Sequence, residues 1–175
     1  MKTTSRIIPI LCIAAAVALT GCEKGSSMSG GGNITAGENS WKIGEALGYY
    51  PDFSDIYEGA IADPVYYLDF YSEGVLETGK GCLIDLEIDL SETDTDEYPE
   101  GRIPDGRFEI GRGLSVTFAM GESFDDPGTE YYPSEGTLTV SGGANDRYTV
   151  EFRGTTSDGT IVSVEYSGKL KMLPL

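Results

Sequence analysis

The sequence predicts an all-β fold, a single antiparallel β-sandwich of about eight strands, on three observations. Apolar residues recur at every second position in several segments, which is the period of a strand with one buried face. No window sustains the period of about 3.6 residues that marks an amphipathic helix. Turns rich in Gly, Asn, Asp and Ser separate the segments, as in antiparallel hairpins. A closed, lipocalin-like up-and-down barrel satisfies the same pattern and remains the alternative.

The strand pattern begins after residue 40 and continues almost to the end of the chain. It is clearest at 84–90, 114–120, 138–140, 148–152 and 162–166, and weaker at 41–49, 65–72 and 106–110. Cys82 is in register with the aliphatic residues of the first clear segment, so we expect its thiol in the core as a small apolar group. The long connections 51–64 and 91–105 are the loops most suited to carry function.

The first residues read as an export signal. Lys2 and Arg6 precede a continuous apolar stretch, 7–19, and small residues follow it. That stretch is shorter than the roughly 20 residues that a membrane-spanning helix needs. The sequence therefore predicts a signal peptide at 1–21, a flexible Gly/Ser-rich tether at 22–40, and one all-β domain at 41–175.

The segment Leu19-Thr20-Gly21-Cys22 resembles the lipobox of bacterial lipoproteins. This resemblance implies cleavage before Cys22, lipid on its thiol and acylation of the new amine, which together give a lasting membrane anchor. The pattern from Ser134 to Leu170 resembles the C-terminal halves of small Bacteroidetes-type outer-membrane lipoproteins of unassigned function, which implies an association with glycan uptake or surface assembly. Only Glu23 is acidic directly after Cys22, so the outer-membrane face, periplasmic or surface, stays open.

The composition excludes several classes of function. The formal net charge is −17, and a surface of that sign repels nucleic-acid phosphates and favours cations or basic partners. The chain contains no histidine, which removes a Ser-His-Asp triad and the commonest zinc ligand. Once Cys12 leaves with the signal and Cys22 is lipidated, Cys82 has no cysteine to pair with, so no disulfide framework is expected.

The best candidate for a binding site lies on the predicted strand 65–72. Tyr67, Asp69 and Tyr71 share one face of that strand, opposite the face of its apolar residues. Two tyrosine rings beside a carboxylate suit a sugar, because the rings pack on the pyranose while the carboxylate accepts hydrogen bonds from hydroxyls. Trp41 and the pairs Tyr49-Tyr50 and Tyr131-Tyr132 are weaker candidates for the same role. The alternative is that tyrosine simply suits strands and that these rings pack on neighbouring strands.

Acidic residues crowd the loop after 90, and Asp94, Asp96 and Glu97 are weak candidates for calcium ligands. The spacing does not match an EF-hand loop, and a solvated acidic face that discourages edge-to-edge association is the simpler interpretation. No cofactor and no catalytic residue are predicted.

These observations together predict a non-catalytic binding or accessory module, anchored by lipid to the outer membrane of the cell envelope. Its partner is expected to be a glycan or another envelope protein. A structural subunit of an envelope assembly is the second hypothesis. A glycoside-active enzyme is the third, since paired carboxylates about 5 to 9.5 Å apart occur by chance in so acidic a chain.

Overall fold

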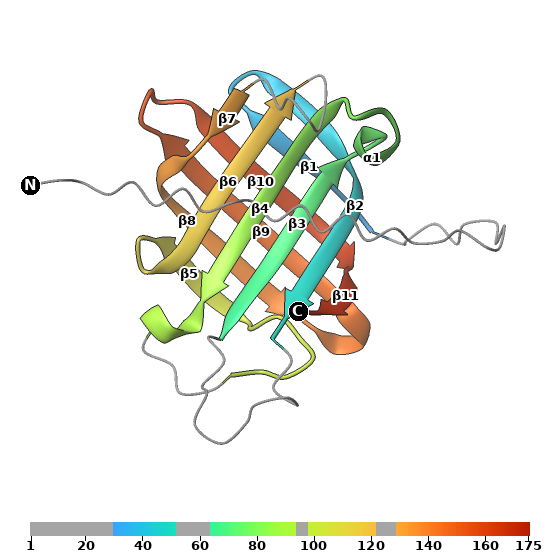
Figure 1. Cartoon of the computed structure of the whole chain (residues 1–175), viewed down its shortest axis with the longest axis vertical. Helices are drawn as coiled ribbons and strands as arrows, with labels where there is room; N and C mark the ends of the chain where they lie inside the picture. The colour runs from blue at the N-terminus through green and yellow to red at the C-terminus, as the bar shows by residue number, and fades with distance from the viewer. Residues whose placement is uncertain (1–29, 52–63, 94–97, 122–128) are drawn as a thin grey trace, which may run out of the picture.

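A computed structural model describes residues 30–51, 64–93, 98–121 and 129–175 (Figure 1). The predicted signal peptide and Cys22 lie outside these residues. The described chain is all-β, as predicted. Seven of the eight predicted segments fall within a strand, and the segment 84–90 does so except for Leu90, which begins a short helix. The strands are β1 (Gly31–Ala36), β2 (Asn39–Tyr50), β3 (Val65–Ser72), β4 (Gly81–Asp89), β5 (Gly106–Ile110), β6 (Gly113–Gly121), β7 (Thr129–Tyr131), β8 (Pro133–Gly142), β9 (Arg147–Thr156), β10 (Ile161–Lys169) and β11 (Lys171–Pro174). The short helices are α1 (Val75–Thr78), η2 (Leu90–Glu92) and η3 (Ala144–Asp146).

Nine of the strands form a closed ring. The order is β1-β10-β9-β8-β5-β6-β4-β3-β2, and β2 pairs again with β1. Neighbours in the ring are antiparallel except β5 and β6, which is required because a closed ring with an odd number of strands must contain a parallel pair. The predicted sandwich is therefore not confirmed, and the barrel alternative fits better. In Figure 1 the strands β2, β3, β4 and β6 in front cross the orange and red strands behind them, because the strands of a closed barrel are tilted to its axis.

The strand that closes the barrel is β1, and it lies within the segment predicted to be a flexible tether. It pairs with β2 on one side and β10 on the other, so the prediction of a tether is wrong for residues 31–40. The glycines that suggested flexibility allow a close approach instead. A Cβ on Gly30 would lie 2.6 Å from the Cα of Gly168, and one on Gly32 would collide with the carbonyl oxygen of Glu165. The domain thus begins near residue 31, about ten residues earlier than predicted.

The interior of the barrel is filled with side chains from all nine strands. The buried apolar residues form one continuous core, which includes Tyr66, Phe70, Phe118 and Phe152, each at most 2% exposed. Cys82 is buried in this core, as its register predicted. A filled barrel of this width leaves room for ligands on its outer face or at its ends rather than inside.

The chain from 98 to 105 crosses the lower end of the barrel as drawn in Figure 1. Two tyrosines from the interior hold it there. The hydroxyl of Tyr66 donates a hydrogen bond to the carbonyl oxygen of Pro99 at 2.8 Å, and the amide of Ile103 donates one to the hydroxyl of Tyr148 at 3.2 Å. Ile103 is 1% exposed, so this segment contributes to the core as well as covering it.

Two short strands lie outside the ring, and each of them pairs with one strand of the ring. β7 pairs with β6, and β11 runs parallel to the second half of β2, beyond the part of β2 that pairs with β1. In the part of the chain that the structure describes, no helix has the length and apolar character needed to cross a membrane.

Candidate functional site

The two faces of β3 are divided as predicted. Tyr66, Leu68 and Phe70 are fully buried inside the barrel. Tyr67, Asp69 and Tyr71 point outward and are half-buried. The partial burial of a charged side chain between two rings on an outer face is unusual, because the simplest outer face of a strand is fully solvated.

The register of β3 with its neighbours adds residues to this face. Asp69 lies directly opposite Asp85 on β4, and Tyr67 lies opposite Glu87 on β4 and Tyr49 on β2. Leu47 and Thr117 border the two aspartates on the outer strands β2 and β6. We use the name tyrosine–carboxylate patch for the outward side chains that these pairings bring together, which are Tyr49, Tyr67, Asp69, Tyr71, Asp85 and Glu87.

The centre of the patch is the pair Asp69 and Asp85. Like charges directly opposite each other on neighbouring strands destabilise a sheet, and burial strengthens their repulsion. Burial first, and then Asp69, raise the pKa of Asp85 to about 8. Burial also raises the pKa of Asp69. The side chains are hydrogen-bonded to each other, so near neutral pH the pair holds one proton between two carboxyls and titrates as a unit.

Tyrosine hydroxyls donate hydrogen bonds to carboxylates of the patch. Tyr71 donates to Oδ2 of Asp69 at 3.1 Å, and Tyr67 is hydrogen-bonded to Glu87. Burial and nearby carboxylates raise the pKa of Tyr49, Tyr67 and Tyr71, so all three hydroxyls stay protonated.

One oxygen of the pair remains unsatisfied. Oδ1 of Asp85 is fully buried and has no hydrogen-bond partner among the described residues. A buried acceptor without a donor costs about 1–3 kcal/mol, so the sheet would be more stable with a smaller or apolar residue at this position. Buried polar groups without complete pairing are concentrated at functional sites, so the pair makes this face the candidate site.

The patch offers groups that can hold a ligand, and its two aspartates do not have the spacing of a glycosidase acid pair. It combines flat ring faces, protonated hydroxyls, carboxylate acceptors and one shared proton. The two aspartates are in hydrogen-bond contact, whereas a glycosidase pair needs about 5 to 9.5 Å between its carboxyl groups for the sugar or the water.

Trp41 does not belong to this patch. It lies at the start of β2, where it packs against the barrel core with its ring 6.1 Å from the ring of Phe118. Tyr131 of β7 packs on the same phenylalanine at 5.6 Å. The structure thus places Trp41 in an aromatic cluster at the end of the barrel opposite the 98–105 segment, not beside Tyr67.

The weak calcium candidates Asp94, Asp96 and Glu97 lie outside the described residues. Within the residues that are described, no group of three or more acidic or cysteine side chains is arranged to hold a metal ion.

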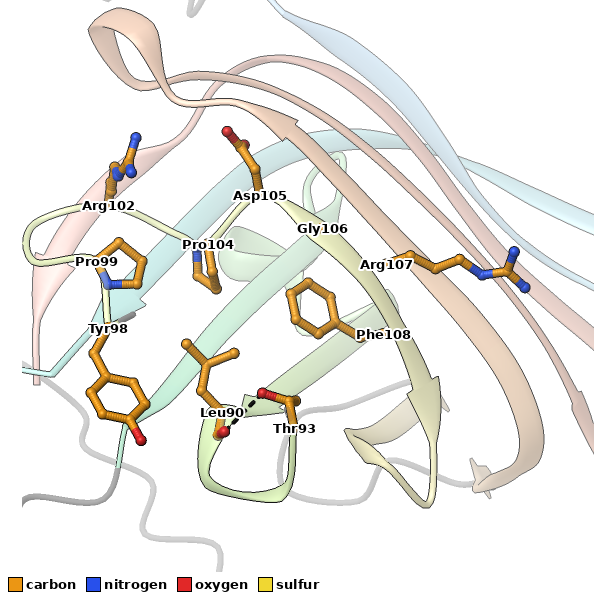
Figure 2. Close-up of a pocket in the computed structure, with 10 residues that line it drawn as sticks. All are labelled: Leu90, Thr93, Tyr98, Pro99, Arg102, Pro104, Asp105, Gly106, Arg107 and Phe108. Carbon is orange, nitrogen blue, oxygen red and sulfur yellow. Dashed lines mark hydrogen bonds between the residues drawn. The ribbon is translucent and has the colours of Figure 1, made fainter. Parts of the chain in front are cut away.

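Apart from the patch, a hollow lies at the lower end of the barrel, with a volume of about 670 Å³ (Figure 2). Leu90, Pro104 and Phe108 point toward its centre, and Tyr98 lies at its edge. Its charged side chains define no single ligand, because Arg102 and Asp105 offer opposite charges at the rim. Arg107 points away and forms an ion pair with Glu109 at 3.4 Å.

The sequence predicts part of the patch. The alternation in β3 identifies Tyr67, Asp69 and Tyr71, and Tyr49 is a weaker candidate, but the pattern does not join Asp85 and Glu87 of β4 to them. The signal that would have joined them is the register of β3 with β4. The connection between these strands contains α1 rather than a two-residue turn, so its length does not fix that register.

Comparison of the chain with protein-family models, with curated proteins and with solved structures gives no match.

Proposed function

We propose that this chain is a non-catalytic binding module of the bacterial cell envelope, anchored by lipid, and that it binds its ligand at the tyrosine–carboxylate patch. The observation that carries this proposal is the outward pair of Asp69 and Asp85, half-buried between tyrosine rings at a cost in stability. Polar groups that are buried without complete pairing and have shifted pKa values are concentrated at functional sites.

The shape of the barrel supports an outer-face site over assembly through strand edges. β7 has three residues and β11 has four, and short edge strands are poor templates for adding a strand from another subunit. Among the described residues these are the strands outside the closed ring. We therefore place recognition on side chains rather than on backbone edges.

A glycan is the first ligand to test, because ring faces and carboxylates are the groups that hold sugars. We expect soluble polysaccharides that match the site to retard the protein in affinity gels. Tyr67→Ala should weaken that retardation by about tenfold, since a ring contact contributes about 0.5–1.5 kcal/mol beyond the area that it buries.

Tyr132→Ala is the matched control for this experiment. Tyr132 is 58% exposed, and its hydroxyl also donates to a carboxylate, that of Glu130, at 2.6 Å, but it lies beyond β7 and away from the patch. If no polysaccharide retards the protein, or if both variants lose retardation equally, the ligand of the patch is not a glycan.

The anchor rests on the export signal and on Cys22, and its test is independent of the patch. Cells that express the chain should incorporate labelled palmitate into it, and Cys22→Ala should abolish the labelling and release the protein from the membrane fraction. Labelling that survives in the Cys22→Ala variant would remove the lipoprotein assignment while leaving the binding site to be judged on its own.

A further inference from the structure

The ligand class of the tyrosine–carboxylate patch can be narrowed, on the basis that the patch is the binding site proposed above. We infer that Asp69 and Asp85 receive a cationic group, a Lys or Arg side chain of a basic protein partner. This group enters between the rings of Tyr67 and Tyr71 and displaces the proton that the two carboxyls share.

The first argument is the direct opposition of the two aspartates. Two adjacent carboxyls have two ways to avoid repulsion, which are to share a proton or to share a cation. Within the described residues, the ion pairs of Lys42 with Glu73, Arg107 with Glu109 and Lys169 with Asp146 involve neither aspartate, and no basic side chain is among the groups that shift the pKa of Asp69 or Asp85. The chain's own described cations therefore do not neutralise the pair.

The second argument is the buried oxygen of Asp85. Oδ1 lacks a donor, although its neighbours on the outer face include three tyrosine hydroxyls. The Tyr71 hydroxyl donates to Asp69 and the Tyr67 hydroxyl bonds Glu87. An ammonium or guanidinium brings several N–H donors to one place, so it can satisfy an acceptor that these hydroxyls leave unpaired.

Aromatic rings and negative charge surround the pair of Asp69 and Asp85. Tyr67 and Tyr71 flank Asp69 along β3, and tyrosine rings attract cations at their faces. Glu45 on β2 and Glu87 on β4 add negative charge to the same outer face, and the whole chain has a formal net charge of −17. A neutral glycan would gain nothing from that charge, whereas a basic partner is steered toward it.

The cation replaces the shared proton, and the charges balance in this exchange. The singly protonated pair carries one negative charge. When the cation binds, both carboxylates ionise, one proton goes to the solvent, and no covalent bond forms other than that of the proton to its new acceptor. The other titratable groups that face the pair are Glu45 and Tyr49 on β2, Tyr67 and Tyr71 on β3, and Glu87 and Asp89 on β4, while β6 presents Ser115, Thr117 and Ala119.

Proton release distinguishes this proposal from glycan binding. We would titrate the purified protein with a short capped oligolysine peptide, using calorimetry in phosphate and in Tris buffer at about pH 7. We expect release of about one proton per bound peptide and an affinity that rises by up to about tenfold per pH unit as the pH increases toward 8. The same peptide with acetylated lysines should bind at least tenfold more weakly.

Asp85→Asn is the decisive variant, with Glu151→Gln as its control. Both remove one carboxylate, but Glu151 lies exposed on β9, outside the patch. Asp85→Asn should abolish proton release and weaken the peptide at least tenfold, whereas Glu151→Gln should leave both nearly unchanged. Equal effects of the two variants would show general attraction to an acidic surface and overturn the inference.

The failure of this inference is distinct from the failure of the proposed function. A polysaccharide that binds without proton release, and that is lost with Tyr67→Ala, would overturn the cation and keep the patch as a binding site. If the peptide and the polysaccharides both fail to bind, the inference and the patch are overturned together.

Discussion

Truncation of Phe118 to alanine should lower the free energy of unfolding by about 3–5 kcal/mol, the cost of a large cavity in a packed core. Phe118 is fully buried on β6 and contacts the rings of Trp41 and Tyr131, which come from β2 and β7. Its loss therefore loosens three strands at one end of the barrel. Urea unfolding followed by the fluorescence of Trp41, the single tryptophan, measures the effect directly.

Two further variants define how this result should be interpreted. Phe118→Leu keeps most of the apolar volume and should cost less than half as much. Tyr132→Ala removes an exposed ring from the residue that follows β7. It should change the free energy of unfolding by no more than about 0.5 kcal/mol. If Phe118→Ala costs no more than Tyr132→Ala, the barrel core is not closed at this end.

Asp85→Asn should make the protein more stable at alkaline pH, by about 1–3 kcal/mol. Burial and Asp69 raise the pKa of Asp85 to about 8 in the folded chain, while an unfolded chain restores the ordinary value near 3.9. Between about pH 4 and pH 8 the folded state therefore binds a proton that the unfolded state has released. The stability of the parent protein should fall as the pH rises through this window and then level off.

Asparagine carries no charge at any pH, so the variant should lose most of that slope. Urea midpoints at about pH 5 and about pH 8 give the comparison, with Glu151→Gln as the control for a general loss of negative charge. If the parent shows no fall in stability over this range, or if Glu151→Gln removes the fall as well as Asp85→Asn does, the two aspartates do not share a proton.

The division of each strand into an inner and an outer face was predictable from the sequence because side chains alternate along a strand. Leu68 and Tyr67 point to opposite sides for that reason, and so do Ile84 and Asp85. Closure of the sheet was not predictable in the same way. It depends on β1, whose polar and glycine-rich sequence carries little strand signal and whose glycines serve close packing against β10.

The candidate site was predictable only in part because its two halves come from different strands. Alternation placed Asp69 beside its tyrosines, but the opposition of Asp69 and Asp85 is a matter of register between β3 and β4. Trp41 illustrates the opposite error. An aromatic residue near the start of the domain suggested a ligand contact. In the structure, the ring of Trp41 on β2 packs against Phe118 and the barrel core.

The position of β1 has a mechanical consequence. If Cys22 carries the lipid, eight residues lie between the anchor and Gly31, and the nine steps from Cys22 to Gly31 span about 30 Å at most. Any force between the membrane and the barrel would then act on β1, which pairs through backbone hydrogen bonds with β10 and β2. The strand that closes the barrel would also be the strand through which such a force acts, and detaching it would separate β10 from β2 and open the barrel.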